Sequence, residues 1–369
     1  MSRKLIGRLL LLLAFIGSPP LFLPSFGEGT GGGSKVLRQQ NLNRWHIVPA
    51  NYSGLTPLGN DRYAVVDDKS ATSGFHIFTI RLNPRTGKVE HVSSTPLLGS
   101  PDSIAKTDCE DIVFCPHDTT LFIAQEGIST IAQYNMDGTS TGRLLRLPPF
   151  FDRGKIRHNA SFEALAYDTA SRRFFFTTEM PLKGDSLHLI AVSDSPSPIL
   201  YRMDAPELKL KAKYYAHGIS AMTAMPDGKL LVMERELSIP PRYVGGKCRI
   251  KVYEIPSYPP KGGRLTPDDS VLPFRGVRGV CSPTSKRLLF TFTTHISRLN
   301  YANYEGMCLG PTLEDGRQTL LLINDSQGGV HNGPFHLKDY IKVVILDSCR
   351  RKERSRPVPL SGVPSGENR

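Results

Sequence analysis

One short block recurs five times along this chain of 369 residues, and this recurrence restricts the possible folds more than any other feature. Each copy opens with Glu or Ser beside an apolar residue, crosses a turn, and ends in an apolar run that closes on an acid. The apolar runs on either side of a turn predict a β-hairpin. The blocks open at residues 53, 110, 163, 220 and 305, and they close on Asp67, Glu126, Glu179, Glu234 and Asp325.

The spacing of the blocks predicts a second hairpin after each one. Successive blocks begin 57, 53, 57 and 85 residues apart, and residues 75–82 and 89–92 flank a turn in the first interval. Four strands in each repeat are typical of a propeller blade, so we predict an all-β β-propeller. We expect six blades, with five as the alternative. The sixth would be a degenerate blade around residues 286–292, and residues 36–48 and 340–346 would close the ring. A tandem β-sandwich is the competing architecture.

The ends of the chain predict export. Residues 1–26 place Arg3, Lys4 and Arg8 before an apolar run and a Pro pair, which is typical of a signal peptide; an uncleaved anchor is the alternative. Residues 27–34 predict a Gly-rich linker, residues 35–349 the propeller, and residues 350–369 a basic disordered tail. We therefore expect a periplasmic or extracellular protein with no stable membrane span in the mature chain.

The formal net charge of +12 does not indicate a nucleic-acid partner. The two terminal segments, residues 1–26 and 350–369, supply seven of these charges, whereas a groove-reading protein concentrates charge within its fold. Six cysteines in an exported chain permit disulfides, and Cys109 and Cys115 are close enough in sequence to bridge the ends of one strand region. Buried free thiols are the alternative.

The acids of the repeat predict a metal site. Residues at equivalent places in successive blades meet around one axis, and clustered carboxylates need protons, Lys or Arg, or a cation such as Ca²⁺. Arg235 and Lys69, which adjoin these acids, are expected to hold an anionic substrate. Each acid taken alone has a simpler explanation as a turn cap or a solvated strand end. The expected metal ligands are Glu110, Glu163, Glu305, Asp67, Glu126, Glu179 and Asp325.

An ordered series of motifs resembles the phytase-like family, an exported β-propeller group described as having esterase-like activity of phytase. The resemblance covers roughly residues 49 to 346. It departs from the family where Asp111 and Ala164 stand in place of a frequent Gly, and where Ser220 opens its block without a carboxylate. The motifs are SGL at residues 53–55, DCEDI at 108–112, AQEG at 124–127, NASFEALA at 159–166, HGIS at 217–220, LVMER at 231–235, YEGM at 304–307 and LLIND at 321–325.

The resemblance implies hydrolysis of phosphate or other esters, assisted by calcium as in β-propeller phytases. Our leading hypothesis is an exported metal-dependent ester hydrolase, a phosphoesterase acting on a small anionic ester. Two alternatives stay open: a non-catalytic propeller that binds a ligand or glycan, and a calcium-dependent lactonase-like propeller. The chain has no G-x-S-x-G elbow, H-E-x-x-H helix or P-loop that would indicate another chemistry.

Overall fold

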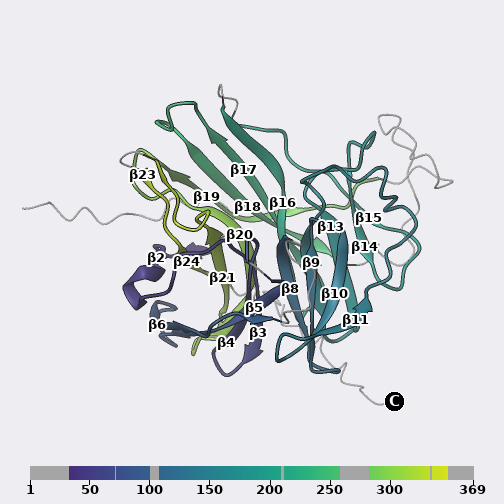
Figure 1. Ribbon diagram of the computed structural model, residues 1–369, viewed down its shortest axis with the longest axis horizontal. Helices are drawn as coiled ribbons and strands as arrows, with labels where there is room; N and C mark the ends of the chain where they lie inside the picture. Colours follow the sequence, from purple (N-terminus) through teal and green to yellow (C-terminus); the bar gives the residue numbers. More distant parts are fainter. Residues whose placement is uncertain are drawn as a thin grey trace, which may run out of the picture.

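The protein is a five-bladed β-propeller. The computed structural model describes residues 33–70, 72–99, 108–208, 212–257, 282–332 and 335–347. In Figure 1, five sheets surround a common axis, with β8 (Cys109–Cys115), β16 (Tyr214–Ala224) and β20 (Asn303–Thr312) near the centre. The predicted all-β propeller is therefore confirmed, with the smaller of the two blade counts.

Each blade is an antiparallel sheet whose first strand lies nearest the axis. The first blade contains β3 (Tyr52–Gly59), β4 (Arg62–Asp67), β5 (Gly74–Leu82) and β6 (Val89–Ser94), with the short β7 (Leu98–Gly99) beside β5. The second contains β8, β9 (Thr120–Gln125), β10 (Thr130–Asn135) and β11 (Ser140–Leu144), and the third β12 (Phe162–Asp168), β13 (Arg173–Thr178), β14 (His188–Val192) and β15 (Ile199–Tyr201). The fourth contains β16, β17 (Lys229–Ile239), β18 (Lys247–Pro256) and β19 (Arg287–His295).

The two ends of the described chain meet in the fifth blade. Here β20, β21 (Gln318–Asp325) and β24 (Tyr340–Ile345) are completed by β1 (Lys35–Val36), and β2 (Gln40–Asn41) also pairs with β24. A 3-10 helix, η1 (Leu42–Trp45), follows β2, and β22 (His331–Asn332) and β23 (Phe335–His336) form a small separate hairpin. The ring closure expected from both ends of the chain is therefore present.

The expected sixth blade is not formed. Residues 287–295 are β19, the outer strand of the fourth blade, and they pair with β18 along its length. The offset of 85 residues between the last two blocks therefore reflects the long connection between Pro256 and Arg287 inside one blade. An apolar strand alternates its side chains in the same way whether it opens a blade or closes one, so its pattern alone does not place it.

The hydrophobic core is divided among the spaces between blades. Five clusters of buried apolar residues each join two neighbouring sheets, as where Ile112 and Leu121 pack with Val66 and Phe75 between the first and second blades. The other four clusters join the remaining neighbours around the ring. Because burial takes place between the sheets, the axis itself is left for other side chains.

The Cys109–Cys115 bridge that the sequence permits is not formed. The two residues begin and end β8, and six steps of extended strand separate them by about 20 Å, whereas a disulfide requires Cα atoms about 4.4 to 6.8 Å apart. Cys115, Cys248 and Cys308 are buried free thiols.

Several sequence predictions concern the ends of the chain. The signal peptide over residues 1–26 and the basic tail over 350–369 lie outside the described residues, as does most of the 27–34 linker. In the described part of the chain, no helix is long and apolar enough to cross a bilayer.

Candidate metal centre

A β-bulge interrupts every inner strand at the residue that opens each sequence block. In the second blade Cys109 faces Gln125 but Asp111 faces Ala124, which leaves Glu110 as the extra residue. The register shifts in the same way around Glu163, Ser220 and Glu305, and across Ser53 and Gly54 in the first blade. A bulge redirects a side chain out of the regular alternation, which is a common device next to functional sites. The repeat found in the sequence is therefore a repeated bulge.

A second set of side chains comes from the end of the second strand in each blade. The backbone N–H groups of Asp68, Glu126 and Glu179 each donate to the residue two positions before the bulge, at 2.8–2.9 Å. Arg235 pairs with Gly218 in the same relation, and Asp325 pairs with Asn303. The equivalent residues of the five blades are thus Asp68, Glu126, Glu179, Arg235 and Asp325.

We call these two sets of residues, together with Lys69, the axial cluster. Carboxylates greatly outnumber cations in it, and most of its members are buried, Glu163 being 6% exposed and Asp325 3% exposed. Glu126 and Glu305 are partly exposed and provide contact with solvent. The carboxylates are Asp68, Glu110, Glu126, Glu163, Glu179, Glu305 and Asp325, and the cations are Arg235 and Lys69.

Three of the carboxylates converge on one point. Glu110, Glu126 and Glu163 each offer an oxygen within 4.8 Å of the other two, and we call them the triad. Glu126 Oε1 accepts a hydrogen bond from the Ser161 N–H at 3.0 Å, which fixes its direction. These hard oxygen donors suit Ca²⁺, which takes several such ligands.

Three polar atoms of the axial cluster have no hydrogen-bond partner among the described residues: Asp68 Oδ1, the Ser220 hydroxyl oxygen and Arg235 Nε. All three atoms are buried. An unpaired buried polar atom is costly, so such atoms usually contact water or a ligand. The donor set and the two oxygen atoms together fit a bound cation.

Arg235 lies on the other side of the axial cluster. Its guanidinium is 5% exposed and contacts three carboxylates: Glu179 at 2.6 Å, Glu163 at 3.4 Å, and Glu305 in a short ion pair. Asn303 holds Glu305 from the opposite side at 2.7 Å. The sequence predicted Arg235 as a substrate anchor, but these contacts already engage its terminal nitrogens.

Lys69 and Asp67 occupy a turn at the edge of the axial cluster. The Lys69 ammonium forms a short ion pair with Asp68, and its side chain is 56% exposed. Asp67 Oδ1 accepts from the N–H groups of Asn51 and Lys69 at 3.3 and 3.2 Å, as in a turn cap. The structure therefore places Asp68, not the predicted Asp67, at the axis.

Burial and mutual repulsion hold protons on the axial cluster. Burial raises the pKa of the Glu110 and Glu163 carboxyls well above their usual range, and the neighbouring carboxylates add to the effect. Burial also raises the pKa of Glu305 to about 8, against the opposing charge of Arg235, and that of Asp325 to about 7. Near neutral pH the cluster therefore exchanges protons readily, and a cation would displace them.

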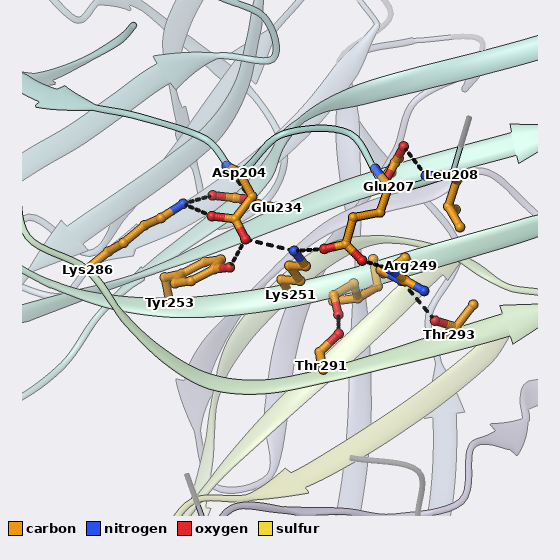
Figure 2. A network of polar contacts seen from close by, with 12 residues as sticks. Asp204, Glu207, Leu208, Glu234, Arg249, Lys251, Tyr253, Lys286, Thr291 and Thr293 are labelled. Carbon is orange, nitrogen blue, oxygen red and sulfur yellow. Dashed lines mark hydrogen bonds and ion pairs between the residues drawn. The ribbon is translucent and has the colours of Figure 1, made fainter. Parts of the chain in front are cut away.

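Glu234, which closes the fourth block in the sequence, points away from the axis. Figure 2 shows it in a separate polar network, where it meets Lys286 at 2.7 Å and Lys286 in turn meets Asp204. The Tyr201 hydroxyl also donates to Glu234, at 2.6 Å. Lys251 extends the network from Asp204 to Glu207, so it ties the segment before β16 to the fourth blade.

The sequence contained a signal for this difference in register. Glu126 and Glu179 lie 16 residues after the openings of their blocks, whereas Asp67 and Glu234 lie only 14 after theirs. Moving one residue further along gives Asp68 and Arg235 a separation of 15, so the spacing indicates a shift, and only the pairing of the strands assigns these two residues. The structure thus brings together all the predicted metal ligands except Asp67, and their binding of a metal stays a prediction.

Among the hollows of the described part of the chain, two lie along the ring. One of about 270 Å³ is mainly apolar and is lined by Ile239, Ile296, Leu299, Tyr301 and Leu337. Tyr301 lines this hollow, and burial, with Cys248, Glu305 and Asp325 nearby, raises the pKa of its hydroxyl well above the usual range.

The other hollow, of about 460 Å³, lies at the opposite ends of the inner strands. Its lining includes Leu55, Ile112, Leu165, Met222 and Met307, one from each blade. These strand ends carry no cluster of charges, and apolar side chains dominate the lining.

Comparison with solved structures finds other propellers at low identity. An aldose sugar dehydrogenase from Streptomyces coelicolor is 13% identical, with 86% of this chain and 98% of that chain covered and a TM-score of 0.36. The Cps50 (Swd1) β-propeller domain from Myceliophteria thermophila is 8% identical, with 85% and 100% covered and a TM-score of 0.35. The periplasmic gluconolactonase PpgL from Pseudomonas aeruginosa is 10% identical, with 80% and 88% covered and a TM-score of 0.33.

These likenesses are too distant to carry an argument about function. A search of curated proteins finds no match. A family model does match, over residues 50–327, which hold all five bulges and the whole axial cluster. The chain therefore belongs to the phytase-like family, whose model is described as "esterase-like activity of phytase".

Proposed function

We propose that the protein is a metal-assisted ester hydrolase that binds Ca²⁺ through Glu110, Glu126 and Glu163. One observation carries this proposal: three carboxylates from two neighbouring blades converge within 4.8 Å at the propeller axis. The contacts of Arg235 leave Glu110 and Glu126 without a guanidinium partner. Like charges held this close favour a divalent cation. The phytase-like family supports ester hydrolysis as the reaction.

The chain's own residues have defined tasks in this proposal. A bound cation would supply a Lewis acid that polarises the ester oxygen and makes water a better nucleophile. Glu110, Glu126 and Glu163 bind and orient the ion, and Ser161 fixes Glu126 through its N–H. Glu305, whose pKa is about 8, can accept or return a proton near neutral pH. Its partly exposed position gives it access to water.

A phosphate ester is the first candidate substrate, because the family is phytase-like. A phosphate group needs cationic or N–H donors that are able to turn toward it. Arg153, Lys155 and Arg157 lie in the segment that leads to β12, and Arg157 Nε donates to the Pro181 carbonyl at 2.9 Å. These cations are the candidate donors for an anionic ester.

An uncharged ester, such as a lactone, is the second candidate. Both cations of the axial cluster already hold carboxylates, Arg235 with three of them and Lys69 with Asp68. The hollow beside Tyr301 offers apolar surface for the remainder of such a substrate. The paired cations of the site thus support a neutral ester, whereas family membership supports a phosphate ester, and the screen below includes both.

A hydrolase screen with purified protein tests the proposal. Phytate, 4-nitrophenyl phosphate, 4-nitrophenyl acetate and a γ-lactone would each be assayed with Ca²⁺ and with a chelator, and Ca²⁺ binding would be measured by calorimetry. We expect binding, and turnover of at least one ester that the chelator abolishes. Binding without turnover would leave the non-catalytic propeller as the better description, and the absence of both would overturn the proposal.

We also propose that the protein is exported, because residues 1–26 have the charge and length of a signal peptide. Fractionation of cells that produce the full chain tests this, since an exported protein would be found outside the cytoplasm with a shortened N-terminus.

A further inference from the structure

We infer that Arg235 takes the place of a second metal ion, so that the axial cluster binds one divalent cation and not two. This inference rests on the proposed function, because it concerns the same site. It concerns how many ions the site takes and which side chains they use.

The position of Arg235 in the repeat is the first argument. The same place holds a carboxylate in the other four blades: Asp68, Glu126, Glu179 and Asp325. In the fourth blade it holds Arg235, which faces Gly218 across the hairpin. The chain thus presents a fixed positive charge where its own symmetry would present a negative one.

The contacts of Arg235 divide the axial cluster into two parts. Glu179 and Glu305 are both bound by the guanidinium, and Glu305 is held on its other side by Asn303. Glu110 and Glu126 have no contact with Arg235, and Glu163 meets it only at 3.4 Å. The triad therefore remains able to bind an ion, whereas the carboxylates opposite it are already neutralised.

The local backbone keeps Glu179 beside Arg235. The Glu179 carbonyl accepts from the Ile219 N–H at 3.0 Å, which joins the third blade to the fourth at this point. A Cβ atom at Gly218 would lie 2.5 Å from Glu179 Cγ, so only glycine leaves room for this approach. The pairing of Glu179 with Arg235 is thus built into the two strands.

Arg235 is a permanent counter-ion. Its side chain is 5% exposed, and its backbone is paired on both sides, with Gly218 and with Ile250. A guanidinium stays charged at every pH at which the protein is folded. It therefore cannot leave as a bound ion can, and it repels a second cation from Glu179 and Glu305.

Two buried oxygen atoms of the axial cluster, one in the first blade and one in the fourth, still lack a partner in the described part of the chain. Asp68 Oδ1 and the Ser220 hydroxyl oxygen have no hydrogen bond among the described residues, although both residues are at least nine-tenths buried. They supply further oxygen donors for one ion, in addition to the carboxylates of the triad. The geometry thus points to one place where a cation can bind, at the triad, and to a second place that the Arg235 guanidinium already occupies.

Calorimetric titration of the full chain with Ca²⁺ tests the inference. We expect the wild-type protein to bind one ion. Arg235→Gln keeps a polar side chain but removes the charge, so it should bind two ions. Adding Glu305→Gln to Arg235→Gln should return the number to one. Arg85→Gln removes an exposed charge that pairs with Glu314, and as the matched control it should still bind one ion.

The outcomes separate this inference from the proposed function. Two ions in the wild-type protein, or one ion in Arg235→Gln with unchanged affinity, would overturn the role of Arg235 but leave the hydrolase standing. No binding by the wild-type protein would overturn both. If Arg235→Gln does not fold, Arg235→Lys provides the test: it keeps the charge and should bind one ion, and two ions in this variant would contradict the inference.

Discussion

The same five inner strands have two very different ends. At one end their bulges and the following strand ends collect seven carboxylates around Arg235 and Lys69. At the other end they line an apolar hollow of about 460 Å³, where the polar side chains bond across blades, as Thr56 does with the Phe114 N–H at 3.1 Å. At the apolar end the side chains pack and form hydrogen bonds with one another. At the other end the clustered carboxylates need protons or a cation to offset their charge.

This difference separates stability from function. Packing at the apolar end gains free energy without help, as in any protein core. Packing at the carboxylate end costs free energy, because burial and like charge both oppose ionisation. A chain that brings these acids together in every blade therefore accepts a less stable ring in return for a binding site. Three substitutions and a pH series test this contrast.

The largest effect is expected from Glu110→Gln at the carboxylate end. The change keeps the shape of the side chain but removes one ligand of the triad, so Ca²⁺ affinity should fall at least about 100-fold. The metal-free protein should unfold at no lower temperature, since a repulsive charge is lost. Calorimetry and thermal unfolding measure the two effects. Glu90→Gln, on an exposed side chain that bonds Asn83, is the matched control and should leave both unchanged.

Met222→Ala at the apolar end should lower the stability of the protein and leave its Ca²⁺ affinity unchanged. Met222 is 1% exposed and packs between the third and fourth blades, so its truncation should cost about 2–3 kcal/mol of unfolding free energy. Ca²⁺ affinity should not change, because no ligand moves. Met222→Leu, which conserves volume, should recover most of the stability. A loss of Ca²⁺ affinity in Met222→Ala would show that the two ends are not independent.

The pH dependence of stability should come from the carboxylate end. Burial raises the folded-state pKa of Glu305 to about 8 and that of Asp325 to about 7, so the folded protein holds protons that the unfolded chain has lost. Without metal, stability should therefore fall by several kcal/mol as pH rises from about 4.5 to 8, since each unit of pKa shift is worth about 1.4 kcal/mol. Ca²⁺ binds at the triad in our proposal, so it should leave in place the part of this slope that comes from Glu305 and Asp325. Thermal unfolding across this range, with Ca²⁺ and with a chelator, measures the effect; a metal-free protein that gains stability over the window would contradict it.

The smallest effect is expected from Lys69→Gln. Its ammonium pairs with Asp68, but the side chain is 56% exposed and solvent screens its charge. Loss of the charge should raise Ca²⁺ affinity about two- to fivefold. The reason is that Asp68 is then no longer paired with a cation of the protein and is able to attract the bound ion. Lys69→Arg keeps the charge and should behave as the wild-type protein. A large fall in affinity in Lys69→Gln would show that Lys69 organises the site.

The sequence predicted the propeller because each blade must build the same buried hairpin. It did not decide between five and six blades, because residues 287–295 have the apolar character of an inner strand although they close the fourth blade. That distinction depends on pairing with β18, which is a long-range contact. The ring closure was predictable from the sequence, because strands at the two ends of the chain, β1 and β24, remained to complete the last blade of the repeat.

The site was predictable in its residue types but not in its register. Glu110, Glu163 and Glu305 were recognised from the repeat, yet nothing in the residues themselves indicated a bulge at each position. A single extra residue exchanges the two faces of a strand. This is why Asp68, and not Asp67, lies at the axis, and why Arg235 stands where the other blades have a carboxylate; its role as a substrate anchor stays a prediction.

Because β1 pairs with β24 in the fifth blade, the ring can close only after β24 has been synthesised. During synthesis Glu110, Glu126, Glu163 and Glu179 leave the ribosome before Arg235, which pairs with Glu163 and Glu179, and β24 follows about a hundred residues later. The ring closes only when β24 meets β1. Until that moment the second and third blades can already bring the triad together, but Glu305 and Asp325 of the fifth blade have not yet completed the axial cluster.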